Sequence, residues 1–344
     1  MKLRIRPAAV FAGLLIFMAA LSDFLSSNPP SAQHLDKFFQ PPSRVHFQDN
    51  HGKLSLRPFI CETELSDSLD IEYREIPSAG YRLEFFFRGY PYRLFHLIPL
   101  DIHLVGRAEK PFFYPLGTDD LGRDVCARVL AGTQTSILVL ILGICFYSVL
   151  GLLIGGLAGL LGGWADSLLM RLSEFVLALP ALYLILALRA LSPVRTPFWH
   201  TLLLTVGIIA AVTWPPMARG VRGLILQLNN STHIEAARSL GGTPFHIFWR
   251  HMLPAMLPFI RMQAVLAAPT FLLGEVVLSF LNVGFRDSGE SWGSMLRSLR
   301  DVRVVTDFWW NLFPLGMVFL TLFWLNTYSS RVRGREAANT VMRM

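Results

Sequence analysis

Acidic side chains at two places in the chain are candidates for chemistry: a group of aspartates and a lone glutamate. The stretch LGTDDLGRD holds Asp119, Asp120 and Asp124, and neighbouring carboxylates can serve as general acid and base in an enzyme. Glu275 is a single acid within the apolar run 271–281. An ionisable group there is costly to bury, so it could line a pathway or couple transport to a proton.

Neither place carries the other groups that an active site needs. No nucleophile or metal-ligand set accompanies the aspartates, so the sequence favours a turn at the membrane border capped by Asp119 or Asp120 over a catalytic pair. Glu275 has a structural alternative, a hydrogen bond between packed helices. No G-x-x-x-x-G-K-[ST], H-E-x-x-H or G-x-S-x-G pattern occurs, and no Cys/His spacing is typical of zinc. We therefore expect no enzyme active site, no ATPase site and no cofactor or metal bound by this chain.

The polar, basic segment 231–254, STHIEAARSLGGTPFHIFWRHMLP, lies between apolar runs and predicts two short helices. Thr232 and Glu235 form a capping-box pattern that would begin the first helix. Gly241 and Gly242 can end it, because glycine readily adopts the left-handed conformation. The Thr-Pro pair that follows favours the start of the second helix. A compact helix-turn-helix between membrane spans is shaped to fit a partner at the membrane surface.

The composition indicates a membrane protein. Of the 344 residues, 53% are hydrophobic and only 16% are charged, which is far more apolar than an ordinary soluble protein. Several apolar runs reach the roughly 20 residues that cross a bilayer. The fold class that we expect is an all-α polytopic membrane protein with about six spans, at residues 8–26, 134–161, 167–190, 199–217, 256–281 and 309–328.

The distribution of basic residues sets the expected orientation. Arginines and lysines flank the N-terminus, the 218–255 loop and the C-terminal tail, which predicts that all three are cytoplasmic. The 282–308 loop, with four arginines, is the exception to this pattern. We attribute the net charge of +7 to this topology. It does not indicate nucleic-acid binding, because no basic patch is interleaved with stacking aromatics. The first span is interpreted as an uncleaved signal anchor.

The long polar loop after the first span has its own character. Alternating residues from Tyr81 to Phe87 predict a strand, and residues 71–76 predict another. We expect a β-containing extracytoplasmic insertion. Cys61 and Cys126 fall in this loop, and their spacing leaves open whether they pair.

Small residues and a proline mark helix contacts in the apolar part. Six glycines between residues 151 and 163, including Gly155-x-x-x-Gly159 and Gly159-x-x-x-Gly163, predict a closely packed helix face. Pro180 predicts a kink in the third span. Arg171 and Glu174, three residues apart, predict an ion pair on one helix face.

Together these residues resemble the permease subunits of ABC importers of the dipeptide, oligopeptide and nickel type. The family's cytoplasmic EAA loop has the form E-A-A-x3-G-x9-I-x-L-P, which this sequence matches at Glu235, Ala236, Ala237, Gly241, Leu253 and Pro254. His251 takes the isoleucine position. The stretch before the second span resembles the family's interfacial elbow, with Gly117, Asp119, Asp120, Gly122, Arg123 and Asp124. The GGWAD stretch at 162–166, Glu275 before LSFL, and the SWG motif at 291–293 also match.

The resemblance covers residues 112–328 and is greatest to the subunit that has a single N-terminal span before the core. It implies four regions: a signal anchor (1–26), the insertion (27–111), the permease core (112–328) and a cytoplasmic tail (329–344). The family's usual Asn after Leu-Pro is Ala255 here, and the insertion is longer than in typical members.

The resemblance also implies how the protein works. A partner ATPase would hold the EAA loop through Glu235, Ala236, Ala237, Arg238, Gly241, Gly242, Pro244, Leu253 and Pro254. The implied partners are a second permease subunit, two ATP-binding subunits that use the ATP, and an extracytoplasmic solute-binding protein. The implied location is the bacterial inner membrane, with both termini cytoplasmic, and the implied cargo is peptides or a similar small solute. The alternative is an ion-coupled secondary transporter with Glu275 as the coupling acid, against which the missing inverted repeat argues.

Overall fold

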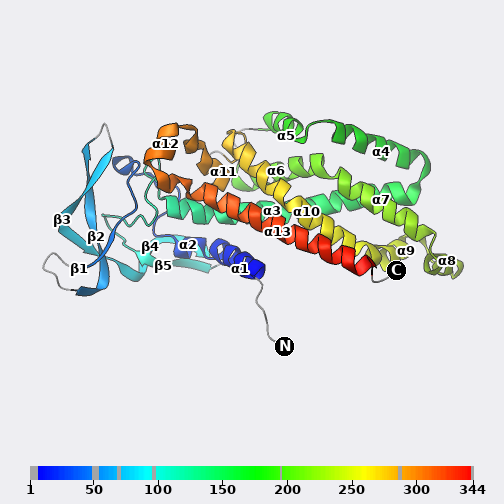
Figure 1. Cartoon of the computed structure of the whole chain (residues 1–344), viewed down its shortest axis with the longest axis horizontal. Helices are drawn as coiled ribbons and strands as arrows, with labels where there is room; N and C mark the ends of the chain where they lie inside the picture. Colours follow the sequence, from blue (N-terminus) through cyan, green and yellow to red (C-terminus); the bar gives the residue numbers. More distant parts are fainter. Residues whose placement is uncertain are drawn as a thin grey trace. The chain divides into compact units, whose positions relative to one another are not determined.

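The computed structural model describes residues 7–48, 54–67, 71–94, 98–193, 196–285 and 289–341. The chain divides into two compact units. The first comprises Met1–Ile137 and Ser279–Leu320, and the second comprises Leu138–Leu278 and Thr321–Met344. Three long helices, traced in Figure 1, contribute residues to both units: α3 (Val125–Leu161), α10 (Leu253–Phe280) and α13 (Phe313–Val341).

The first unit holds the five strands found in the described part of the chain, together with several short helical segments. Helices α1 (Pro7–Ala20) and α2 (Ser22–Leu25) come first, followed by the 3-10 turn η1 (Leu35–Lys37). An antiparallel sheet has the order β1-β2-β3, and a separate antiparallel pair joins β4 to β5. The strands are β1 (Val45–Gln48), β2 (Leu54–Asp67), β3 (Glu72–Arg82), β4 (Glu84–Leu94) and β5 (Ile98–Gly106). The residues of the predicted insertion therefore do form β structure.

The strand predicted from Tyr81 to Phe87 is confirmed only in part, because these residues are divided between two strands. Strand β3 ends at Arg82, and β4 begins at Glu84 after one residue outside both strands. Leu83 and Phe87 are buried as the alternation required, but Phe85 is 58% exposed. Phe86 has a positive φ of 55°, which interrupts the regular pleat between these positions. Residues 72–76 of the other predicted strand lie in β3.

The rest of the first unit packs around the beginning of α3. Four short helical segments follow one another: α11 (Trp292–Met295), η3 (Leu296–Arg300), α12 (Val302–Asp307) and η4 (Trp309–Leu312). Their buried side chains form a core with the first turns of α3, made of Val125, Val129, Met295, Val304, Phe308 and Trp310. The ring of Phe39 stacks on that of Phe308, with 4.2 Å between centroids.

The second unit is helical. It contains α4 (Gly163–Ala178), α5 (Ala181–Ala190), α6 (Phe198–Thr213), α7 (Pro215–Asn229), α8 (Thr232–Ser239), α9 (Pro244–Ile247) and the π-helical turn η2 (Phe248–Met252). Helices α4 and α5 are bent by 94° at the break before Ala181, so the kink predicted at Pro180 is confirmed. Helices α6 and α7 are bent by 53° at the proline pair that begins α7.

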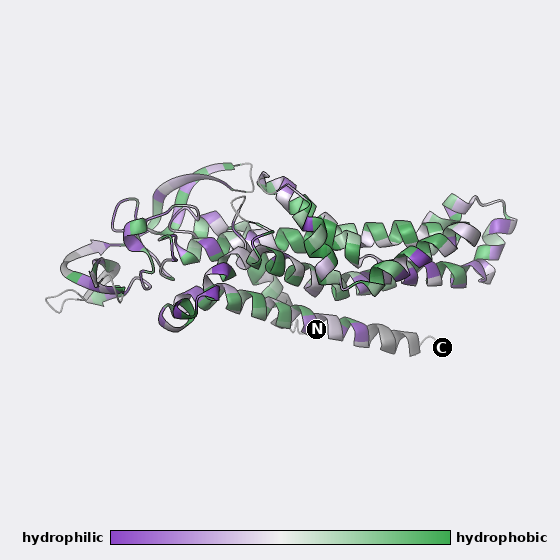
Figure 2. Cartoon of the chain, turned by 90° about the horizontal axis from the view of Figure 1, so that it is seen from above, coloured by the Kyte–Doolittle hydropathy of each residue, from purple (hydrophilic) through white to green (hydrophobic). Residues whose placement is uncertain are grey.

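The predicted number of spans is not reproduced. In the described part of the chain, three helical stretches are long and apolar enough to cross a membrane: Val125–Leu161, Pro244–Phe280 and Trp309–Gly334. The number rises to five if each bent pair counts as one span. The first predicted span, 8–26, becomes the 14-residue α1 and the short α2, because the helix breaks at Leu21. In Figure 2 the long helices carry mostly hydrophobic residues.

The predicted glycine face is confirmed over two turns of α3. A Cβ at Gly155 would lie 2.3 Å from the carbonyl oxygen of Ala218 in α7, so only glycine permits this approach. A Cβ at Gly151 or Gly159 would likewise collide with α7 side chains. The face does not extend to Gly163, which is the first residue of α4 and has a positive φ and nothing within 4 Å of its Cβ position.

Candidate functional site

Residues 231–254, the docking segment, form the predicted helix-turn-helix, but the first helix begins differently from the prediction. Ser231, not Thr232, is the N-cap of α8, and its side chain makes no capping hydrogen bond. The Ser231 hydroxyl instead donates to the carbonyl of Leu228, at 2.5 Å. Because Thr232 is already the first helical residue, the predicted capping box with Glu235 is wrong. The Glu235 side chain is exposed.

The Gly-Gly turn ends α8 as predicted. Gly241 has a φ of +85°, which favours glycine. The N–H of Gly242 donates to the carbonyl of Ala237 (3.0 Å), and the N–H of Gly241 donates to that of Arg238 (2.9 Å). These two bonds define a Schellman motif, which satisfies carbonyls at the helix end and fixes the turn.

The start of the second helix is also confirmed. The Thr243 hydroxyl accepts a hydrogen bond from the N–H of His246 at 3.3 Å, and Pro244 occupies the first helical position. Helix α9 continues through η2 into α10, whose first two residues are Leu253 and Pro254. The docking segment is therefore continuous with a long helix at its C-terminal end.

The docking segment exposes apolar side chains that the sequence analysis did not single out. Leu240 is 89% exposed and Phe245 is 74% exposed, while Trp249 lies one turn after Phe245 with their ring centroids 6.0 Å apart. Ile234 and Ile247 are buried and hold the two helices in place. Large apolar groups exposed on a polar segment are typical of interaction surfaces. The available signal was the i, i+4 spacing of two aromatics beside the turn.

Helix α7, which leads into the docking segment, is tied to α4 by arginines. Arg222 makes a bidentate contact with Asp166, with 2.6 Å from Nη2 to Oδ2. Arg219 donates to the Ser173 hydroxyl (3.0 Å) and lies 3.5 Å from Glu174. The predicted Arg171–Glu174 ion pair is also present, at 3.4 Å. These contacts bind α7 to α4 beside the glycine contacts with α3.

In the first unit, Asp119 organises the elbow before α3. Its Oδ1 accepts the backbone N–H groups of Leu121 and Arg123, each at 2.9 Å. Its Oδ2 accepts from the Arg123 Nε at 2.8 Å and from the Arg128 guanidinium. The side chain is buried and both oxygens are engaged, which does not suit a general base. Asp120 is half exposed and lies 3.7 Å from Arg123, so the same guanidinium faces both carboxylates.

Two glycines let the elbow pass close to the chain that precedes it. Gly117 and Gly122 have φ values of +69° and +68°. A Cβ at Gly122 would lie 1.8 Å from the carbonyl oxygen of His34, and one at Gly117 would lie 2.6 Å from that of Gln40. Both positions therefore require glycine for conformation and for space.

Asp119 caps the turn as predicted, and Asp124 provides a second cap, at the start of α3. The Asp124 Oδ1 accepts the N–H groups of Cys126 (2.8 Å) and Ala127 (3.2 Å), the first donors of α3. Its Oδ2 accepts from Asn28 Nδ2 at 2.8 Å. Helix α3 thus begins at Val125, before the predicted start of its span at residue 134.

Asp124 gives a testable pH dependence. Burial raises its pKa from 3.8 to about 6, although its three hydrogen bonds oppose the shift. Because the folded pKa is the higher one, the folded state holds the proton more tightly. The resulting stability is present below about pH 4 and is lost as pH rises through about 6. The melting temperature of the detergent-purified parent should therefore fall as pH rises from about 4 to above 6. In Asp124→Asn, which has no carboxyl group at this position, we expect this fall to be smaller. Identical pH profiles for the two proteins would contradict it.

Arg128 and Glu290 complete a buried charge cluster with Asp119 and Arg123, which the sequence analysis missed. Arg128 donates to Glu290 Oε2 from Nε (2.9 Å) and lies within 2.8 Å of it through Nη2. Arg123 Nη1 lies 3.9 Å from Glu290 Oε1. The Arg128 side chain is only 4% exposed. Its position four residues after the Asp124 cap, at the start of an apolar helix, was the available signal.

Glu275, the remaining predicted site residue, is fully buried in α10 within the second unit. Its neighbour Gly274 lies against Ile209 of α6, so this part of α10 packs closely on another helix. This environment fits the packing role and assigns no pathway to the residue.

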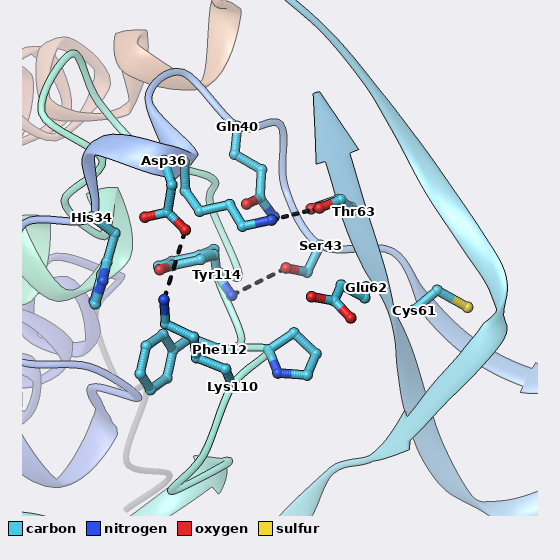
Figure 3. A pocket seen from close by; sticks show the side chains of 12 residues that line it. His34, Asp36, Gln40, Ser43, Cys61, Glu62, Thr63, Lys110, Phe112 and Tyr114 are labelled. Atoms are coloured by element: carbon cyan, nitrogen blue, oxygen red, sulfur yellow. Dashed lines mark hydrogen bonds and ion pairs between the residues drawn. The ribbon is translucent and has the colours of Figure 1, made fainter. Parts of the chain in front are cut away.

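A small polar cavity of about 120 Å³ lies in the first unit, beside β2 (Figure 3). Its charged walls are largely engaged with one another. Lys37 donates to the carbonyl of Thr63 at 2.5 Å, and Lys110 lies 3.7 Å from Asp36. The cavity contains none of the predicted site residues.

Comparison with known proteins identifies the chain. Residues 151–331, which hold the docking segment, α7 and Glu275, match the family model described as the inner membrane component of binding-protein-dependent transport systems. The chain belongs to this family. The protein is therefore a permease subunit of an ABC importer. The charged elbow lies before the matched region.

Curated relatives agree with this assignment. The permease is 33% identical over 237 residues to Escherichia coli DdpC, named a probable D,D-dipeptide transport system permease protein, covering 68% of this chain and 77% of that one. It is 31% identical over 219 residues to the oligopeptide transport system permease protein OppC of Bacillus subtilis, covering 63% and 69%. The inward-facing MetNI methionine ABC transporter aligns over 60% of this chain and 95% of its own, with 17% identity and a TM-score of 0.46. The family gives no support to an ion-coupled secondary transporter.

Proposed function

We propose that the permease carries peptides or similar small solutes across the bacterial inner membrane. It would act with a second permease subunit, two ATP-binding subunits and an extracytoplasmic solute-binding protein. The cargo class is supported by the names of its relatives, which include dipeptide and oligopeptide permeases. The chain itself would bind no nucleotide, and its partners would supply the energy.

In this proposal the docking segment is the contact with an ATP-binding subunit. The observation that carries it is a rigid, polar helix-turn-helix with Leu240, Phe245 and Trp249 exposed on it. A groove on the partner would cover these side chains, and the Schellman turn would keep the two helices at a fixed angle. The exposed Glu235 and Ala236 would border this contact.

Force on the docking segment would pass to the apolar helices through α7. Helix α7 directly precedes α8 and is held to α3 by the glycine contacts and to α4 by Arg222 and Arg219. ATP binding to the partner would favour one permease conformation only if the ATP-bound partner binds the docking segment more tightly in that conformation than in the other. The basic flanks favour a cytoplasmic location for the segment and for both termini, with the β-containing insertion outside.

The Gly241→Asp variant tests the docking proposal. Nothing lies within 4 Å of a Cβ at Gly241, so the variant adds a charge to the turn without a clash inside the chain. Gly241→Asn is the matched control, because asparagine has the same size, tolerates a positive φ and carries no charge. We expect Gly241→Asp to lower ATP-dependent uptake in reconstituted vesicles at least tenfold and to weaken co-purification with the ATP-binding subunit. Gly241→Asn should retain both within about twofold.

Two results would overturn the proposal. One is normal co-purification and uptake by Gly241→Asp. The other is an equal loss in both variants, because that would indicate backbone strain at the turn and not a disturbed contact. Size-exclusion profiles of both variants show whether either has unfolded.

A further inference from the structure

His46, Cys61 and Glu75 bring three different metal-ligating groups together in the first unit. One ligand atom from each side chain, a nitrogen, a sulfur and an oxygen, lies within 4.8 Å of the other two. All three residues are partly buried, and Cys61 is a free thiol that is not paired with Cys126. The cluster lies outside residues 151–331, so the family match assigns it no role.

The strand register explains why these side chains meet. His46 of β1 lies opposite Phe59 of β2, and Glu75 of β3 lies opposite Thr63 of β2. Residues 59, 61 and 63 alternate along β2 and so share one face of the sheet. The stacked rings of His46 and Phe59, 5.6 Å apart, agree with this placement. Three adjacent strands therefore present the cluster on one face.

Figure 3 separates the cluster from the small polar cavity. The Glu62 carboxylate points toward the cavity, whereas the Cys61 thiol points away from the other labelled side chains. Cys61 contributes to the cavity wall, but its sulfur faces the other way. The groups close to the Cys61 sulfur are those of His46 and Glu75, each with a ligand atom within 4.8 Å of it.

The donor atoms of these three side chains favour one kind of metal ion. The His46 Nε2 lies 3.0 Å from Glu75 Oε2, and this pair alone needs no metal. A thiol beside the pair completes the mixed set of donors that Zn²⁺ takes in proteins. Calcium and magnesium prefer sites made only of oxygen.

We propose that His46, Cys61 and Glu75 form a Zn²⁺ site with three protein ligands and a fourth position open to water. On binding, the proton that His46 Nε2 shares with Glu75 leaves that hydrogen bond and the imidazole keeps its proton on Nδ1, so Nε2 and the carboxylate each form a metal bond. The Cys61 sulfur forms the third bond, and its proton passes to solvent. The metal ties β1 and β3 to β2, so its binding free energy stabilises the three-stranded sheet.

The test is metal binding by the full chain, purified in detergent with a tag that contains no histidine. Cys126→Ser and Cys145→Ser leave Cys61 as the only thiol. The chain is stripped with a chelator and titrated with Zn²⁺ against a chromogenic competitor. We expect one tight Zn²⁺ per chain. His46→Ala, Cys61→Ser and Glu75→Gln should each lower the Zn²⁺ affinity at least about tenfold. Even the loss of a residue that only orients a metal ligand costs about that much. His200→Ala, which changes an exposed histidine of α6, is the matched control and should have no effect.

A second measurement does not depend on whether the ligand variants fold. In the single-thiol chain, Zn²⁺ should slow the alkylation of Cys61 by a maleimide at least tenfold, and Mg²⁺ or Ca²⁺ should not. The proposal fails if Zn²⁺ leaves the alkylation rate unchanged. It also fails if folded Cys61→Ser binds Zn²⁺ as tightly as the parent, or if Ca²⁺ protects the thiol equally.

Discussion

Arg128→Met is expected to destabilise the first unit by about 3–5 kcal/mol, the usual cost of removing one partner from a buried ion pair. The Arg128 side chain is 4% exposed and its guanidinium binds Asp119 and Glu290. Asp119 precedes α3 by a few residues, whereas Glu290 comes from a distant part of the sequence. Methionine keeps most of the side-chain length but leaves both carboxylates without their shared cation. A lower SDS midpoint in mixed-micelle unfolding, together with a lower melting temperature, measures the effect.

Arg303→Met is the matched control for this experiment. Arg303 faces Asp307 at 3.4 Å with both side chains half exposed, and such pairs contribute about 0–1 kcal/mol. A double variant, Arg128→Met with Asp119→Asn, should recover part of the loss, because one of the stranded charges is removed. Equal losses for Arg128→Met and Arg303→Met would show that burial of the cluster does not govern its stability.

Gly155→Ala is expected to lower stability by about 1–3 kcal/mol, and Gly155→Leu by more. The added Cβ would lie 2.3 Å from a backbone oxygen of α7, which a side-chain rotation cannot relieve. Helices α3 and α7 must therefore move apart. Since α7 leads into the docking segment, we also expect ATP hydrolysis by the assembled importer to become less dependent on transport. Mixed-micelle unfolding and the ratio of ATP hydrolysed to solute transported measure the two effects.

Gly207→Ala serves as the control for the glycine contact. Gly207 lies inside α6 with nothing within 4 Å of its Cβ position, so alanine there should be neutral or slightly stabilising. If Gly155→Ala and Gly207→Ala had the same effect, the close approach of α3 and α7 would be refuted as a source of stability.

Local sequence rules predicted the features that depend on a few neighbouring residues. The Gly241–Gly242 turn, the Thr243 cap and the bend at Pro180 each follow from backbone preferences within one turn. The glycine face of α3 follows from helical spacing. The family resemblance extended these local features to a function, which the matched region 151–331 supports.

Features that depend on distant residues could not be predicted in this way. Arg128 and Glu290 are 162 positions apart, and nothing local shows that they meet. The second oxygen of Asp124, the cap of α3, accepts from Asn28, which lies 96 positions earlier in the chain. The span count differed because hydropathy continues through Leu21 and Pro180, where the backbone breaks. Hydropathy measures composition, whereas helix ends are set by backbone hydrogen bonds.

The exposed apolar side chains of the docking segment also bear on quality control in the cell. A copy that has not met its partner leaves Leu240, Phe245 and Trp249 open to water. Exposed apolar groups of this kind favour aggregation and recognition by chaperones and proteases. A partner groove that covers them would remove that signal. The surface proposed to receive force would then also mark which copies are still unassembled, and so would help to balance the amounts of the subunits.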